Sequence, residues 1–219
     1  MPKKIFHVVG TDTNIGKTYV CCQLVKHFNM AGVLSNALKP IATGVVANIN
    51  PDVKEIMEVN SYPLDYKIIN PFCFEPAIAP HIAASIENTK LTVDKLNTYL
   101  QNSFESLVDS YVFIEGVGGV MVPLNEDETY LDLLQKISEP IILTVGIKLG
   151  CLNHALLTLN ALKSKNLNVV GWVANCIENM PYEKENIEYL KKSLNIPFLA
   201  EVAYGGRLST TAHFSELII

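Results

Sequence analysis

The stretch GTDTNIGKT, from Gly10 to Thr18, constrains the fold of this chain more than any other. It follows a short apolar run at residues 5–9 and leads into residues 19–30, which have helical apolar periodicity. A strand, a glycine-containing loop and a helix in this order form a phosphate-binding loop, where backbone N–H groups and the positive end of the helix dipole face the phosphates. The sequence therefore predicts a nucleoside triphosphate site near its start.

Three residues of this loop carry the expected chemistry. Gly16 lets the phosphates approach the backbone closely, Lys17 can reach the β- and γ-phosphates, and the Thr18 hydroxyl can ligate Mg²⁺. The spacing departs from the usual G-x-x-x-x-G-K-S/T pattern, because five residues rather than four separate Gly10 from Gly16. A glycine-rich turn ahead of a helix, with no ligand, is the alternative interpretation.

The composition narrows the class of protein. A net charge of −5 and no visible basic stripe argue against nucleic acid as a main partner. The apolar run near the start is stopped by Gly10 and Asp12, and no stretch approaches a membrane span, so we expect neither a signal peptide nor a membrane partner. The cysteines have no metal-type spacing and are expected to be buried apolar residues in a reducing compartment. They are Cys21, Cys22, Cys73, Cys151 and Cys176. We therefore expect a cytoplasmic protein with one domain, residues 1–219.

Short apolar runs alternate with longer helical patterns, which predicts an α/β fold with a mostly parallel sheet and helices on both faces, like a P-loop NTPase. We expect strands at residues 5–9, 34–38, 111–114, 140–145, 169–174 and 197–201, the last of these ending the sheet. We expect helices at residues 17–31, 52–59, 82–86, 92–107, 129–138, 152–165 and 182–194. The stretch 62–80, rich in proline and aromatic residues, is expected to be an ordered loop.

Two carboxylates are candidates for a metal site beside the phosphates. Glu115 directly follows a buried strand, and Asp52 begins a helix after the loop that follows Lys39. Ligands bind at the carboxyl ends of parallel strands, and Mg²⁺ takes one or two carboxylates in addition to phosphate oxygens. Alternatively, Glu115 only bonds the glycine-rich backbone after it, and Asp52 is an ordinary carboxylate at a helix N-terminus.

Two further segments fit a small-molecule substrate. Lys39 at a strand end is followed by Thr43 and Gly44, which suit a small-ligand pocket. Residues 150–154 open a helix whose free N–H groups could hold a carboxylate, although a helix start with no ligand is equally compatible. That helix is apolar around most of its surface, which indicates burial on two sides, as at a subunit interface. His81 and His154 are lone histidines of the kind that is more often structural.

Six motifs occur in one order and are spread over nearly the whole chain: GTDTNIGKT, LKPIATG, NPFCFEPAIAPHIAA, FIEGVGGVMVPL, ILTVGIKLGCLNHALLT and GWVANC. Together they resemble the dethiobiotin synthetase family. The resemblance implies an ATP-dependent cyclo-ligase of biotin synthesis that joins 7,8-diaminononanoate and CO₂ into the ureido ring of dethiobiotin, releasing ADP and phosphate. It also implies Mg²⁺ as a cofactor and a homodimer with the substrate site at its interface. The unusual spacing of the phosphate-binding loop is that of the family.

The resemblance implies roles for individual residues. Lys39 and Lys17 would be catalytic, and Thr18, Asp52 and Glu115 would bind the metal. The nucleotide would contact Thr13, Asn14, Ile15, Gly16, Lys17, Thr18, Tyr19, Asp52, Glu115, Gly116, Val117, Gly118, Asn175 and Cys176. The substrate would contact Thr11, Lys39, Thr43, Gly118, Lys148, Gly150, Cys151, Leu152 and Asn153.

Two segments depart from the family pattern. Asn14 stands where relatives often carry glutamate, and residues 203–208 lack the proline-containing segment and acidic residue that relatives use around the base and ribose. Because an asparagine amide at position 175 can pair with more than one base, we hypothesise relaxed base selectivity, with nucleotides other than ATP accepted.

Two rival functions remain. An amide-forming synthase for a cobalamin precursor shares this type of loop but would need a glutamine amidotransferase domain, for which the chain is too short. A partitioning or metal-delivery ATPase switch would carry an additional lysine early in the loop, where this chain has Gly10-Thr11. Neither rival explains the segments at residues 39–44 and 150–154.

Overall fold

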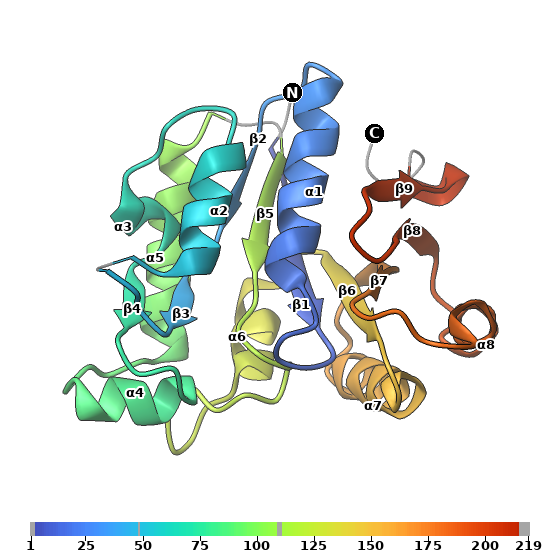
Figure 1. The fold of residues 1–219 in the computed structure, drawn as a ribbon. Coiled ribbons are helices and arrows are strands. Elements are labelled where there is room, and N and C mark those ends of the chain that lie inside the picture. Colours follow the sequence, from blue (N-terminus) through green and yellow to red (C-terminus); the bar gives the residue numbers. More distant parts are fainter. Residues whose placement is uncertain (1–2, 48, 109–110, 215–219) are drawn as a thin grey trace.

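The computed structural model describes residues 3–47, 49–108 and 111–214. Within these residues the main sheet has seven strands in the order β2-β5-β1-β6-β7-β8-β9 (Figure 1). All neighbouring strands are parallel except the last pair, β8 and β9. The strands are β1 (Lys4–Gly10), β2 (Ser35–Leu38), β5 (Tyr111–Glu115), β6 (Ile141–Ile147), β7 (Val169–Cys176), β8 (Phe198–Val202) and β9 (Leu208–Thr210). The prediction of a mostly parallel sheet is confirmed.

Helices cover both faces of this sheet, as predicted. Side chains alternate along β1, so that Phe6 and Val8 join one apolar cluster and Val9 joins the other. The first cluster contains residues of α1 (Lys17–Met30) and α2 (Pro51–Val59), which lie side by side (Figure 1). The second contains residues of α6 (Tyr130–Ile137), α7 (Cys151–Ser164) and α8 (Glu183–Ser193). The remaining helices are α3 (Tyr66–Ile69), α4 (Pro80–Ile86) and α5 (Val93–Ser106), the last of which packs against α6.

Local sequence signals set several helix ends. Asn50 caps α2 by accepting bonds from two backbone N–H groups, and Pro51 follows in the first helical position, where its missing N–H costs nothing. At α6, Thr129 and Asp132 form a reciprocal capping box. α1 ends just before Gly32, which has a φ of +76° and so cannot continue the helix.

Two predictions about the fold are wrong. Residues 62–80 are not one loop, because they contain α3 and β4 (Phe72–Phe74), and β4 pairs in parallel with β3 (Ile41–Thr43) in a separate two-stranded sheet. Residues 197–201 do not end the main sheet, because β9 adds an antiparallel strand after β8. Each of these missed strands has three residues, too few for an alternating pattern to be recognised.

The expectation of buried cysteines is met by four of the five. All five cysteines are free, and four are buried, whereas Cys73 is only half-buried. Among the described residues, no helix is long and apolar enough to cross a membrane.

Candidate active site

The phosphate-binding loop connects β1 to α1, and its glycines are required by close contacts. Gly16 has a φ of +75°, and a side chain there would collide with the amide of Asn175. A side chain at Gly10 would lie 2.8 Å from the Lys17 side chain. Only glycine fits these two positions while the loop keeps its shape.

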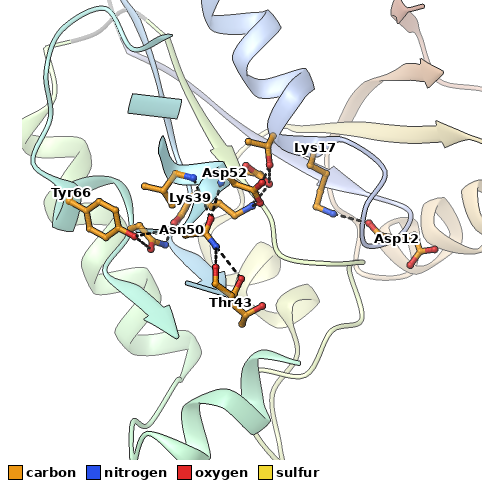
Figure 2. A network of polar contacts seen from close by, with 12 residues as sticks. Asp12, Lys17, Lys39, Thr43, Asn50, Asp52 and Tyr66 are labelled. Atoms are coloured by element: carbon orange, nitrogen blue, oxygen red, sulfur yellow. Dashed lines mark hydrogen bonds and ion pairs between the residues drawn. The ribbon is translucent and has the colours of Figure 1, made fainter. Parts of the chain in front are cut away.

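Lys17 lies buried inside this loop. Only 7% of the residue is exposed, and its Nζ donates a 2.8 Å hydrogen bond to the Asp12 carbonyl (Figure 2). Burial disfavours the charged form and lowers the pKa of Lys17 to about 8, against an opposing contribution from the Glu115 carboxylate. The loop therefore contains a cation that an anionic ligand would stabilise.

Lys39 lies at the end of β2 and joins two carboxylates. Its Nζ is 2.7 Å from Asp52 Oδ2 and 2.5 Å from Glu115 Oε1. Burial alone would lower the pKa of Lys39, but the charges of Glu115 and Asp52 outweigh it and raise the pKa above its usual value. Lys39 is therefore a permanent cation at neutral pH.

The oxygen atoms around Lys39 fit a magnesium ion. The Thr18 hydroxyl donates a 2.8 Å bond to Glu115 Oε1, and Asp52 Oδ2 accepts a 2.7 Å bond from the Lys39 ammonium. Glu115 Oε2 is buried and has no hydrogen-bond partner among the described residues. A buried carboxylate oxygen without a partner, beside a hydroxyl and a second carboxylate, is the all-oxygen donor set that Mg²⁺ prefers.

A cavity of about 870 Å³ brings these groups together. Its size suits a nucleotide and a small substrate. The predicted site residues that line it are Thr13, Asn14, Gly16, Lys17, Thr18, Tyr19, Lys39, Thr43, Asp52, Glu115, Gly116, Val117 and Gly118. The cavity therefore unites the loop, the candidate metal ligands and the Lys39–Thr43 segment.

Other predicted residues lie outside this cavity lining. Ile15 is fully buried, and Asn175 is 4% exposed and donates a 2.8 Å bond from Nδ2 to the Ile15 carbonyl. Cys176 is buried with its Sγ near Glu183 and Glu201, and burial together with these carboxylates raises the pKa of its thiol to about 12. The remaining predicted residues outside the lining are Thr11, Lys148, Gly150, Cys151, Leu152 and Asn153.

The start of α7 lies beside the phosphate-binding loop, on the other side of Asp12. Lys148 Nζ donates a 3.0 Å bond to Asp12 Oδ2, and this bond holds the pKa of Asp12 below its usual value. Gly150, with a φ of +91°, precedes α7, and Asn153 is exposed. This segment thus borders the loop through Asp12, and within its first helical turn Asn153 is exposed whereas Cys151 is buried.

Several residues of the site are not predicted from the sequence. Asp12 connects the loop to Lys148, and Asn50 connects Thr43 to α2. The cavity lining also includes Glu55, Ala77, Ile78, Ala79, Pro80, Val122 and Pro123. The helix-start pattern Asn50-Pro51-Asp52 is a signal that identifies Asn50 as a cap, whereas the contacts of Asp12 have no local signal.

The fold and the site together define a P-loop NTPase. The solved structure of the signal recognition particle receptor FtsY from Elizabethkingia anophelis, in complex with GDP, matches with a TM-score of 0.61 and 14% identity, over 100% of this chain and 63% of that one. The MinC:MinD complex of Aquifex aeolicus matches with a TM-score of 0.56 and 9% identity, over 98% of this chain and 84% of that one. At such identities the likeness concerns the fold alone.

Sequence relatives identify the family. Residues 4–211 match a protein family described as an AAA domain. The ATP-dependent dethiobiotin synthetase BioD of Legionella pneumophila (strain Corby) is 41% identical over 94% of this chain and 96% of its own length. The BioD protein of Cellvibrio japonicus is 39% identical over 92% of this chain and 90% of its own length. The BioD protein of Wigglesworthia glossinidia brevipalpis is 38% identical over 97% of this chain and 94% of its own length. The chain belongs to the ATP-dependent dethiobiotin synthetases.

Proposed function

We propose that this protein uses ATP to close the ureido ring of dethiobiotin from 7,8-diaminononanoate and CO₂ in biotin biosynthesis. One substrate amine adds to CO₂ and loses a proton, which gives a carbamate. A carbamate oxygen then takes the terminal phosphoryl group of ATP, which releases ADP. The second amine attacks the carbonyl carbon of this mixed anhydride, and phosphate leaves with closure of the ring.

The observation that carries this proposal is the position of Lys39 and Lys17 on one cavity, which also contains Thr43. A free alkyl amine resembles a lysine, with a pKa of about 10.4, and is mostly protonated at neutral pH. With Mg²⁺ neutralising Glu115 and Asp52, the two lysine charges would disfavour the substrate ammonium and favour the carbamate anion. Each pKa unit corresponds to about 1.4 kcal/mol. Alignment and charge neutralisation then suffice for phosphoryl transfer, so no side-chain nucleophile is required.

We propose Thr18, Glu115 and Asp52 as the residues that hold Mg²⁺. The ion would supply positive charge beside the phosphate oxygens. The buried, unpartnered Glu115 Oε2 supports this assignment. Lys17 would bind the phosphates, and the nucleotide would extend along Thr13, Asn14 and Tyr19, which line the cavity.

We propose a homodimer in which the start of α7 contributes to the substrate site. Residues Lys148 to Asn153 would reach the substrate carboxylate of the neighbouring subunit, while Thr11 and Thr43 would contact substrate from the first subunit. Exposed apolar side chains support an interface here, because Leu149 is 90% exposed and Leu157 of α7 is 60% exposed. We also propose that residues 1–219 act as one domain in the cytoplasm, where the five free cysteines would stay reduced.

The test of the proposed function is product formation. The purified protein is incubated with 7,8-diaminononanoate, bicarbonate, Mg²⁺ and ATP, and dethiobiotin is sought by mass spectrometry. Omitting either ATP or the diamine should abolish the product. ATP hydrolysis without dethiobiotin would instead support a nucleotide-driven switch.

Relaxed base selectivity is a further expectation. GTP and CTP should support dethiobiotin formation at rates within about tenfold of ATP, a gap of about 1.4 kcal/mol. The segment after β8, which departs from the family pattern, is attached to α1 by a 2.7 Å bond from the Tyr19 hydroxyl to the Gly206 carbonyl. It lacks the acidic residue that the family pattern places around the base and ribose, and this absence is the basis of the expectation. An exclusive preference for ATP in parallel assays of the three nucleotides would contradict this expectation.

The buried Lys17 should make ATP binding dependent on pH. Its pKa of about 8 in the free protein means that the ammonium loses its proton as the pH rises through this value, whereas bound phosphates would keep it protonated. ATP affinity should therefore fall above pH 8, with uptake of about half a proton per ATP at pH 8 and nearly one at about pH 9. Calorimetry in two buffers of different ionisation enthalpy measures this uptake. Uptake near zero at both pH values would contradict the low pKa of Lys17.

A further inference from the structure

Asn50 connects two segments of the candidate site through both halves of its amide. Its Oδ1 accepts bonds from the backbone N–H groups of Asp52 (3.1 Å) and Val53 (3.3 Å), which caps α2. Its Nδ2 donates to the carbonyls of Thr43 (3.0 Å) and Gly44 (2.8 Å), as Figure 2 shows. The residue is only 3% exposed, and each half of the amide makes two bonds.

A second buried amide, that of Asn70, holds the backbone of Lys39. Asn70, which is 2% exposed, donates a 2.6 Å bond from Nδ2 to the Lys39 carbonyl, and the Lys39 N–H donates to the Ile69 carbonyl at 3.0 Å. The Tyr66 hydroxyl lies between the two amides, 3.3 Å from Asn70 Oδ1 and 3.4 Å from the Asn50 backbone nitrogen. Burial raises the pKa of Tyr66 to about 12, so this hydroxyl keeps its proton at neutral pH.

These contacts form a closed ring around the catalytic lysine candidate. The ring runs from the Lys39 backbone through Asn70, Tyr66 and Asn50 to Asp52, whose carboxylate returns to Lys39 Nζ at 2.7 Å. Among the described residues, the only side-chain hydrogen bond that links Thr43 to this ring is the one from Asn50 Nδ2 to the Thr43 carbonyl. A helix cap needs the amide oxygen alone. The two bonds from Nδ2 therefore serve the Thr43 segment rather than the helix.

We propose that Asn50 is a positioning residue for the diamine substrate. It places Thr43 relative to Lys39 and Asp52, and it does so through the two carbonyls that it holds, without lining the cavity itself. This inference rests on the proposed function, in which Thr43 contacts the diamine. It assigns to Asn50 a part in diamine recognition that is separable from ATP binding.

The variant Asn50→Asp separates the two halves of the amide. Aspartate caps helices as well as asparagine does, so the bonds from Asp52 and Val53 are kept. The donors to Thr43 and Gly44 are lost, and carboxylate oxygens then face two carbonyl oxygens. We expect the KM for diaminononanoate to rise about tenfold or more, equivalent to about 1.4 kcal/mol, while the KM for ATP changes less than about twofold.

Asn29→Asp is the matched control. Asn29 Nδ2 donates to the Val59 carbonyl at 3.0 Å, and its Oδ1 accepts from Ser35 and Ser61, so this change also removes an amide donor beside α2, at the end opposite Asn50. Both KM values should be unchanged in this variant. If Asn50→Asp does not fold, Asn50→Ser keeps a capping oxygen but lacks the amide nitrogen that reaches the Thr43 and Gly44 carbonyls, and the same split between the two KM values is expected.

The assay distinguishes failure of this inference from failure of the proposed function. An unchanged KM for the diamine in the folded Asn50 variant, or equal rises for diamine and ATP, would overturn the positioning role alone. Absence of dethiobiotin with the unmodified protein would overturn the proposed function and this inference with it.

Discussion

Replacing Lys39 with alanine is expected to reduce dethiobiotin formation by roughly 10³-fold or more, the scale seen when a group that stabilises transition-state charge is lost. Lys39 stays charged at neutral pH, and it lines the same cavity as the phosphate-binding loop and Thr43. Its ammonium would face both the carbamate and the phosphoryl group that it receives. ATP should still bind, because Lys17 and the backbone of the loop are untouched. Single-turnover product formation and equilibrium binding of a fluorescent ATP analogue measure the two properties separately.

The same substitution changes stability, and this effect has to be separated from catalysis. Without Lys39, the Glu115 carboxylate, whose side chain is 1% exposed, keeps its burial but loses its counter-charge. Removing one partner of a buried ion pair costs about 3–5 kcal/mol. We therefore expect Lys39→Ala to be less stable, and the double variant Lys39→Met with Glu115→Gln to recover stability without recovering activity.

Lys54→Ala is the control for loss of a lysine near the site, because Lys54 is exposed on the same helix as Asp52. It should retain full activity. Turnover by folded Lys39→Ala close to that of the unmodified protein would remove Lys39 from the mechanism. Loss of ATP binding together with turnover would assign Lys39 to nucleotide binding instead.

Elements with a local signal are predictable from the sequence. The apolar run before Gly10 and the helix that ends at Gly32 are confirmed as β1 and α1. The buried run before Glu115 is confirmed as β5. Each is defined by periodicity over several residues and by a terminator, which are properties of contiguous sequence.

Short strands that depend on distant partners are not predictable in this way. β3 and β4 have three residues each, and their pairing brings Ile41 opposite Phe72 across the whole of α2 and α3. β9 exists because it completes the edge of β8. Whether such a short segment forms a strand depends on the strand that it pairs with rather than on its own sequence.

The candidate site also has a part that the sequence predicts and a part that depends on contacts between distant segments. The loop residues and Glu115 were predictable as neighbours, because strand ends in a parallel sheet meet at one edge. The contacts that fix them join distant segments, as Lys148 does with Asp12 and Asn70 does with the Lys39 carbonyl. From the sequence alone, a polar residue whose hydrogen-bond partner is distant in the chain cannot be told from a solvent-exposed one.

Mixing two inactive variants, Lys17→Ala and Asn153→Ala, is expected to restore about a quarter of the activity of the unmodified protein. In a symmetric dimer with shared sites, each mixed dimer contains one site with both residues intact and one with both replaced. Random exchange makes about half of all dimers mixed, which gives the expected fraction. The structure supports this design because Lys17 lines the cavity, whereas Asn153 is exposed outside its lining.

The experiment needs verified mixed dimers, which two different affinity tags and sequential purification provide. Each variant alone should remain inactive. Mixing Lys17→Ala with a second cavity variant, Lys39→Ala, should restore nothing, because in the proposed dimer both residues would belong to the same half of the shared site. Recovery in the first mixture but not in the second requires a site made from two chains. No recovery in verified mixed dimers of Lys17→Ala and Asn153→Ala would mean that each subunit holds a complete site, and the exposed face of α7 at Leu149 and Leu157 would then serve assembly alone.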